Sequence, residues 1–180
     1  MKITGERVNL RQLEASDAKS IFKYAKDKQI SLYTTLPHPY ITKDAKAFIE
    51  LTKKHSEKKS DFELGIELKE TKEIIGMMSL MDIDYKNKSA EVGYWIGTPY
   101  WRQGFTREAL CLLLKFGFAK LKLKRIWARV MDSNIASSRL LESVGFSYEG
   151  RARKAVYKNK TWLDQLRYSI LNEEFRGLLN

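Results

Sequence analysis

The segment from Glu91 to Thr106 has the clearest chemical meaning in this sequence. Residues 91–96 alternate in polarity as a strand does, and the stretch Arg102-Gln103-Gly104-Phe105-Thr106 then leads into a long apolar helix. A glycine at such a turn lets a ligand approach the backbone, and the free N–H groups at a helix start attract negative charge. The pattern predicts a phosphate-binding turn. An ordinary strand-to-helix turn, in which Gly104 only relieves the backbone, is the alternative that these residues leave open.

A second polar segment follows the next predicted strand. Asn134 begins a short helix that carries Ser137 one turn later and ends at Gly145. The side chain of Asn134 has two roles open to it, because it can cap its own helix or reach a ligand lying alongside.

Hydrophobic periodicity and turn residues predict the elements that hold these segments in place. Strands are predicted at residues 8–12, 62–68, 74–83, 90–96, 125–130, 146–157 and 162–171, and helices at 16–25, 42–52, 105–121 and 134–144. The order is β-α-α-β-β-β-α-β-α-β-β, which indicates an α/β (α+β) mixed sheet with helices on both faces. With 180 residues and no linker or repeat, the sequence predicts one domain over residues 1–180.

Composition excludes several classes of protein. Hydrophobic residues make up 43% and charged residues 31%, as in an ordinary globular chain. No apolar run approaches the roughly 20 residues of a membrane span, so we expect no membrane association and a cytoplasmic location. Cys111 is the only cysteine, and no Cys/His cluster has metal-ligand spacing, so we expect no metal. The net charge of +11 favours anionic partners, although lysines scattered along the chain are more typical of a solvated surface.

Taken together, these segments resemble the GNAT acetyltransferase superfamily. The resemblance covers nearly the whole chain: the element order, residues 90–96, the Gln103-Gly104-Phe105 turn, residues 134–146, and the tail from Glu149 to Tyr168. Within the superfamily, the chain is most similar to the RimJ/RimL-type ribosomal-protein N-terminal acetyltransferases. The match is highly specific for fold and cofactor and weakly specific for the acceptor.

The resemblance implies a binding site for acetyl-CoA. In such enzymes the central sheet is splayed after the strand that holds Tyr94, and the pantetheine arm lies in the gap while the pyrophosphate meets the following turn. The implied cofactor-binding residues are Tyr94, Trp95, Ile96, Trp101, Arg102, Gln103, Gly104, Phe105, Thr106 and Asn134. The family turn usually begins with Gln or Arg and ends with Gly or Ala. Here Trp101 and Thr106 stand at those two places, and the Thr106 side chain could cap the helix, contact a phosphate or lower the affinity.

The resemblance also supplies candidates for the chemistry. Glu91, at a strand position where the superfamily often places its base, is the candidate general base, acting directly or through water. Ser137 is the candidate acid for the departing sulfur, because the helix tyrosine of many members is replaced by Leu141. The backbone amide of Ile96 is the expected oxyanion donor. Without these roles, Glu91 is a strand carboxylate paired with a lysine, and Ser137 is a small polar residue on a helix.

The implied activity is transfer of an acetyl group from acetyl-CoA to a primary amine in a ternary complex. The amine could belong to a protein N-terminus, such as that of a ribosomal protein, or to a small molecule. The expected partners are this acceptor, the ribosome and a second copy of the chain in a homodimer. The alternative from another class is a non-catalytic module that binds RNA or a protein through its basic surface.

Overall fold

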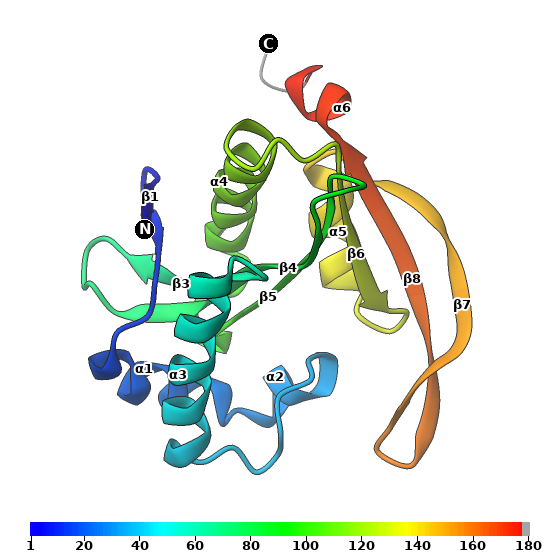
Figure 1. Ribbon diagram of the computed structural model, residues 1–180. Coiled ribbons are helices and arrows are strands. Elements are labelled where there is room, and N and C mark those ends of the chain that lie inside the picture. The colour runs from blue at the N-terminus through cyan, green and yellow to red at the C-terminus, as the bar shows by residue number, and fades with distance from the viewer. Residues whose placement is uncertain (178–180) are drawn as a thin grey trace.

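A computed structural model describes residues 1–177 of the chain (Figure 1). One eight-stranded sheet crosses the molecule in the order β1-β2-β3-β4-β5-β6-β8-β7. Every neighbouring pair is antiparallel except β5 and β6, which are parallel. The strands are β1 (Lys2–Thr4), β2 (Val8–Arg11), β3 (Phe62–Leu68), β4 (Ile74–Asp84), β5 (Ser89–Ile96), β6 (Arg125–Met131), β7 (Ser147–Lys158) and β8 (Thr161–Leu171). The predicted mixed sheet is confirmed.

Helices cover both faces of the sheet, as predicted. They are α1 (Ala18–Ala25), α2 (Lys28–Tyr33), α3 (Thr42–Lys58), α4 (Phe105–Ala119), α5 (Ile135–Ser143) and α6 (Asn172–Gly177). Sequence periodicity missed β1, α2 and α6 because these elements span only three to six residues, too few to show a repeat. Within residues 1–177, no helix combines the length and the apolar character that crossing a membrane requires.

The helices form two separate cores with the sheet. On one face, Ile21 of α1 and Ile49 of α3 pack with Ile74 and Met77 of β4. On the other face, the fully buried side chains of α4 pack against the central strands and against Leu141 of α5. We call these the α3 face and the α4 face.

The central strands separate partway along their length. Strands β5 and β6 pair only at Ser89↔Arg125, Ala90↔Ile126 and Glu91↔Trp127. Beyond Glu91, β5 stays paired with β4, whereas β6 continues alongside β8 as far as Met131. The splayed sheet is therefore present, and it opens a gap inside the sheet between residues 92–96 and the second half of β6.

Candidate active site

The edge of β5 that borders this gap has unpaired backbone groups. The N–H of Gly97 donates to the carbonyl of Ile75 at 2.8 Å, so the backbone of Gly97 points toward β4. Backbone direction alternates along an antiparallel strand, so the N–H and C=O groups of Tyr94 and Ile96 point the opposite way, into the gap. The carbonyl of Ile96 accepts from Trp101 Nε1 at 2.9 Å. The N–H of Ile96 therefore faces the gap, beyond the last residue at which β5 pairs with β6, and is placed to donate to a ligand.

The gap leads to the start of α4, where further backbone donors are free. Gly104, just before the helix, has φ +82°, a conformation that glycine adopts without strain. The first helical hydrogen bond is donated by Glu108 to the carbonyl of Gly104, at 3.1 Å, and no side chain caps the helix. The amides of residues 105–107 therefore face outward, as anion binding requires. Thr106 does not cap the helix, and Arg102 is exposed.

Arg7, a residue that sequence reasoning missed, holds this turn in place. Its Nη1 donates to the carbonyl of Gln103 at 3.0 Å, its backbone N–H donates to Glu108 at 2.8 Å, and its guanidinium lies 4.6 Å from the ring centroid of Phe105. The Gln103 side chain donates to the carbonyl of Pro99 at 2.7 Å. The turn is thus fixed from two sides, which preorganises its amides.

Glu91 lies where β5 and β6 part. It is buried, with 5% of its surface exposed, and both of its carboxylate oxygens accept from Arg129, at 2.9 and 2.5 Å. The hydrogen bonds from Arg129 to Glu91 raise the pKa of the guanidinium. The partner of Glu91 is therefore an arginine from the neighbouring strand, not a lysine. An ionised carboxylate has about four acceptor positions, so about two remain for a water or an amine.

Ser137 meets Tyr94 on the α4 face of the gap. Their hydroxyl oxygens are 2.8 Å apart, and burial raises the pKa of Tyr94 to about 12. Asn134 accepts from the backbone N–H of Ser137 at 3.3 Å, so its side-chain oxygen caps α5. Of the two roles left open for Asn134, capping is the one that this geometry shows.

The two candidate catalytic side chains lie on opposite faces of the sheet. Glu91 and Tyr94 are three residues apart on one strand, so their side chains point to opposite faces. Tyr94 packs against the core of the α4 face, whereas Trp95 packs against the core of the α3 face. A group that enters the gap from the α4 face would meet Ser137, and a group that enters from the other side would meet Glu91.

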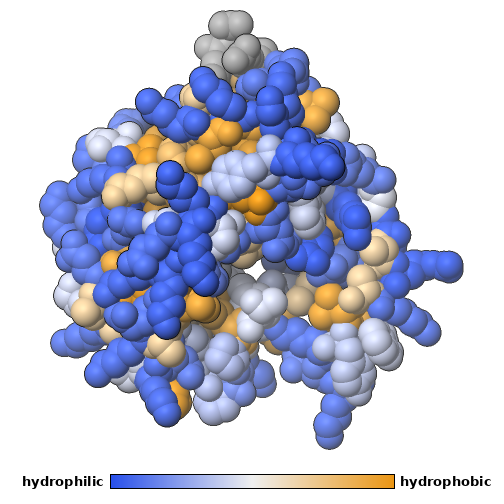
Figure 2. Space-filling model, viewed as in Figure 1, coloured by the Kyte–Doolittle hydropathy of each residue, from blue (hydrophilic) through white to orange (hydrophobic). Residues whose placement is uncertain are grey.

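Among residues 1–177, neither α1 nor α3 packs over the part of the α3 face formed by β6 and β8. Helices α1 and α3 pack over β3 and β4, and Figure 1 shows the long β7–β8 hairpin standing clear of them. Strand registers place a set of polar and aromatic side chains together on this surface, which we call the open face: Ser89, Glu91, Arg125, Trp127, Arg129, Glu149 and Arg167. Figure 2 shows the molecule hollowed between the α1–α3 side and the hairpin.

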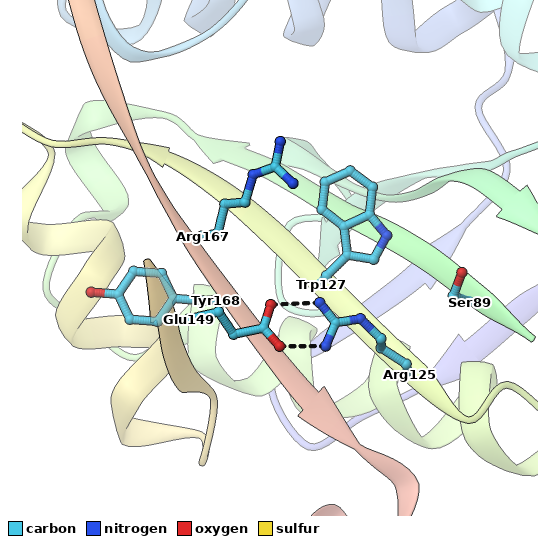
Figure 3. A pocket seen from close by; sticks show the side chains of 6 residues that line it. All are labelled: Ser89, Arg125, Trp127, Glu149, Arg167 and Tyr168. Carbon is cyan, nitrogen blue, oxygen red and sulfur yellow. Dashed lines mark hydrogen bonds and ion pairs between the residues drawn. The ribbon is translucent and has the colours of Figure 1, made fainter. Parts of the chain in front are cut away.

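A pocket of about 140 Å³ lies on the open face (Figure 3). Its lining comes from β5, β6, β7 and β8: Ser89, Arg125, Trp127, Glu149, Arg167 and Tyr168. Both guanidinium Nη atoms of Arg125 donate to Glu149 at 2.5 Å, and these bonds lower the pKa of Glu149 to about 2. Arg129 lies 5.4 Å from the ring centroid of Trp127. Sequence reasoning missed this arginine cluster, although alternation along the predicted strand 125–130 puts Arg125, Trp127 and Arg129 on one face.

The sequence analysis grouped the turn around Gly104 with the strand that ends at Ile96 as one cofactor site, and this assignment stays a prediction. The structure brings Tyr94, Ile96, Trp101 and Ser137 to the same gap. Within residues 1–177, no cluster of His, Cys, Asp or Glu side chains could hold a metal ion.

Comparison with known proteins agrees with this geometry. A family model described as an acetyltransferase (GNAT) domain matches residues 7–147. The uncharacterized N-acetyltransferase YoaA of Bacillus subtilis is 35% identical over 166 residues, which cover 92% of this chain and 94% of the relative.

Solved structures share the whole fold. Spermidine N-acetyltransferase from Vibrio cholerae, in complex with CoA and spermine, superposes with a TM-score of 0.82 at 27% identity, covering 97% of this chain and 99% of the other. The ribosomal-protein-S5-alanine acetyltransferase from Vibrio fischeri has a TM-score of 0.86 at 24% identity, covering 97% and 98% of the two chains. At 24% identity, the similarity to the Vibrio fischeri enzyme shows a shared fold alone.

Proposed function

The chain belongs to the GNAT acetyltransferase family and is an acetyl-CoA-dependent N-acetyltransferase, and from this premise we propose that it acetylates a primary amine by direct transfer at the β5–β6 gap. One observation carries the proposal: the N–H of Ile96 faces the gap where β5 has parted from β6, and the amides of residues 105–107 at the start of α4 are uncapped. An extended polar chain would pair with β5 as an added strand. A pyrophosphate at the end of that chain would then meet the uncapped amides at the start of α4.

The open face is the side from which we propose that the amine arrives. The ammonium form has no lone pair, so a group near the gap must accept a proton before attack. Glu91 borders the gap and retains acceptor positions beside Arg129, and we assign it this role, directly or through a water. The N–H of Ile96 would stabilise the negative oxygen that develops on the acetyl group.

Ser137 is the proposed acid for the departing sulfur. With its pKa raised to about 12, the Tyr94 hydroxyl keeps its proton at neutral pH. If Tyr94 donates to Ser137 Oγ, the proton of Ser137 is left free to point into the gap. Tyr94 is then a positioning residue for Ser137.

The remaining expectations are proposals of the same kind. The acceptor is a protein N-terminus, such as that of a ribosomal protein, or a small amine. The enzyme acts in the cytoplasm. Residues 1–180 form one domain, and two copies associate through the C-terminal strands. Strand β7 supports association because it is a long, exposed outer strand of the sheet. No feature of the described residues favours a non-catalytic module over an enzyme.

Calorimetric titration with acetyl-CoA tests the proposal. We expect saturable micromolar binding at one site per chain, followed by release of free thiol when an amine acceptor is added. Absence of binding would mean that Arg102 and Thr106 spoil the turn, and the non-catalytic alternative would then be preferred.

A further inference from the structure

Arg167 differs from the other two arginines of the open face. Arg125 is paired with Glu149, and Arg129 is paired with Glu91. Arg167 is exposed, and its guanidinium has no hydrogen bond or ion pair with any residue in the range 1–177, although its charge contributes to the lowered pKa of Glu149. In Figure 3 its guanidinium lies beside the ring of Trp127, at the rim of the pocket.

The two glutamates of the open face are each paired with an arginine. Glu91 and Glu149 each accept two hydrogen bonds from an arginine, and Glu149 also accepts from Ser169 at 2.7 Å. Asp82, in the irregular part of β4, interacts with Arg129 only at longer range. A polycation would meet Glu91 and Glu149 beside the arginines that pair with them and Asp82 at longer range, whereas an anion would find a planar guanidinium that no carboxylate holds, with five N–H donors.

The position of Arg167 relative to the gap limits the kind of anion. Glu91 is in register with Trp127, and Trp127 with Ser169, whereas Arg167 is the partner of Arg129, so Arg167 lies two strands from Glu91 and two residues further along. Two strand spacings of ~4.8 Å and an offset of two residues at ~3.3 Å each separate the two backbone positions by roughly 12 Å. An extended peptide covers that distance in about four residues at ~3.3 Å each. The α-carboxylate of a free amino acid is only one carbon from its amine, which is too close.

We propose that Arg167 binds a carboxylate of the acceptor, and that the acceptor is a polypeptide N-terminus with Asp or Glu among about its first four residues. The inference rests on the proposed transfer to an amine at the β5–β6 gap and adds the acceptor class. Trp127 forms the floor between the β5–β6 gap and Arg167. A peptide lying across Trp127 would reach Arg167 with an acidic side chain. The planar guanidinium suits bidentate contact with a carboxylate.

Peptide binding tests the recognition without requiring turnover. Three hexapeptides with Ala at position 1 and Glu-Asp, Gln-Asn or Lys-Lys at positions 3 and 4 are titrated calorimetrically into the full chain saturated with CoA. We expect the acidic peptide to bind at least about tenfold more tightly than the neutral one, and the basic peptide most weakly. Arg167→Gln should bring the acidic peptide to the affinity of the neutral one while leaving CoA affinity unchanged.

A charge-matched control distinguishes a specific contact with Arg167 from the general attraction of a basic protein for acidic peptides. Lys46→Gln removes one positive charge from an exposed position of α3 and should keep the preference for the acidic peptide. Equal binding of all three peptides, tighter binding of spermidine or free glutamate, or an unchanged preference in Arg167→Gln would overturn the proposal. Thiol release is read separately: acidic peptides that bind through Arg167 without being acetylated would refute the transfer chemistry and leave the recognition intact.

Discussion

Among single residues, Glu91 has two roles to separate, as a proton acceptor and as the partner of Arg129. We expect Glu91→Gln to keep acetyl-CoA affinity and to lower turnover about a hundredfold, within the usual range for loss of a general base. The activity that remains should rise toward high pH, because the amine must then lose its proton to solvent. Turnover measured from pH 6 to 10, with calorimetry for the cofactor, checks this.

Arg129→Gln is the matched variant for that test. It breaks the same ion pair but leaves the Glu91 carboxylate in place. We expect a much smaller loss of turnover than in Glu91→Gln. Equal losses in the two variants, with unchanged pH profiles, would make Glu91 a structural partner of Arg129 and remove it from proton transfer.

Ser137 and Tyr94 form the second residue-level test. We expect Ser137→Ala to lower turnover by one to two orders of magnitude with a thiol as leaving group, because the sulfur then departs without a proton donor. Tyr94→Phe should cost less, since Tyr94 only orients Ser137. With its pKa raised to about 12, Tyr94 keeps its proton below that pH, so the ratio of wild-type to Tyr94→Phe rates should be constant from pH 6 to 9. A ratio that changes with pH in this range would contradict the assignment.

At the scale of the element, the turn before α4 depends on Gly104. An alanine there would adopt φ +82° at a cost of about 1 kcal/mol, and its Cβ would come within 3.0 Å of Arg7 Nη2. We expect Gly104→Ala to weaken acetyl-CoA binding about tenfold as the turn shifts. Calorimetry gives the affinity, and thermal unfolding gives the cost to stability.

Gly150 provides the control for Gly104. It lies in β7 with φ +148°, and a Cβ at this position would meet nothing within 4 Å. We expect Gly150→Ala to lower stability by a similar amount without changing the affinity for acetyl-CoA. A loss of cofactor affinity in both variants would indicate a general effect of destabilisation.

Helices and strands long enough to show a full repeat of hydrophobic and polar residues were predictable from the sequence. The alternation in residues 90–96 and the apolar stripe of 105–121 predicted β5 and α4, and the turn between them was read from Gly104 and its neighbours. The separation of β5 from β6 came only from the family resemblance, because strand pairing is a long-range property that neither strand encodes alone. The short helix α2 shows no period, although Asp27 caps it by accepting from the N–H of Gln29 at 2.9 Å.

For the molecule as a whole, contacts between distant segments complete the site and were not predictable. Arg7 and Glu108 are about a hundred residues apart and share no local pattern, yet their contact fixes the turn. The pair of Glu91 with Arg129 required the β5–β6 register. The hairpin tip is also held from a distance, since Lys158 Nζ donates to the carbonyls of Ser31 and Thr34 near α2.

A long-range polar network also sets the stability of the whole molecule in acid. Burial alone would raise the pKa of Glu67, but hydrogen bonds from Asn9 at 2.8 Å, Arg11 at 2.5 Å and Lys2 at 3.1 Å outweigh it and lower the pKa to about 2. These bonds join β1 and β2 to β3. Because the folded-state pKa is lower than the unfolded-state value, the unfolded chain binds the proton more tightly.

The stabilisation from Glu67 is therefore fully present above about pH 4.5 and is lost as the pH falls toward 2. At about 1.4 kcal/mol per pKa unit, it is worth a few kcal/mol. We expect Glu67→Gln to lower the free energy of unfolding at pH 7 and to flatten its dependence on pH between 5 and 2, as measured by urea denaturation. Glu57→Gln, at an exposed position of α3, should change neither. An equally steep acid dependence in Glu67→Gln would show that other carboxylates, with Glu149 the first to examine, control unfolding in acid.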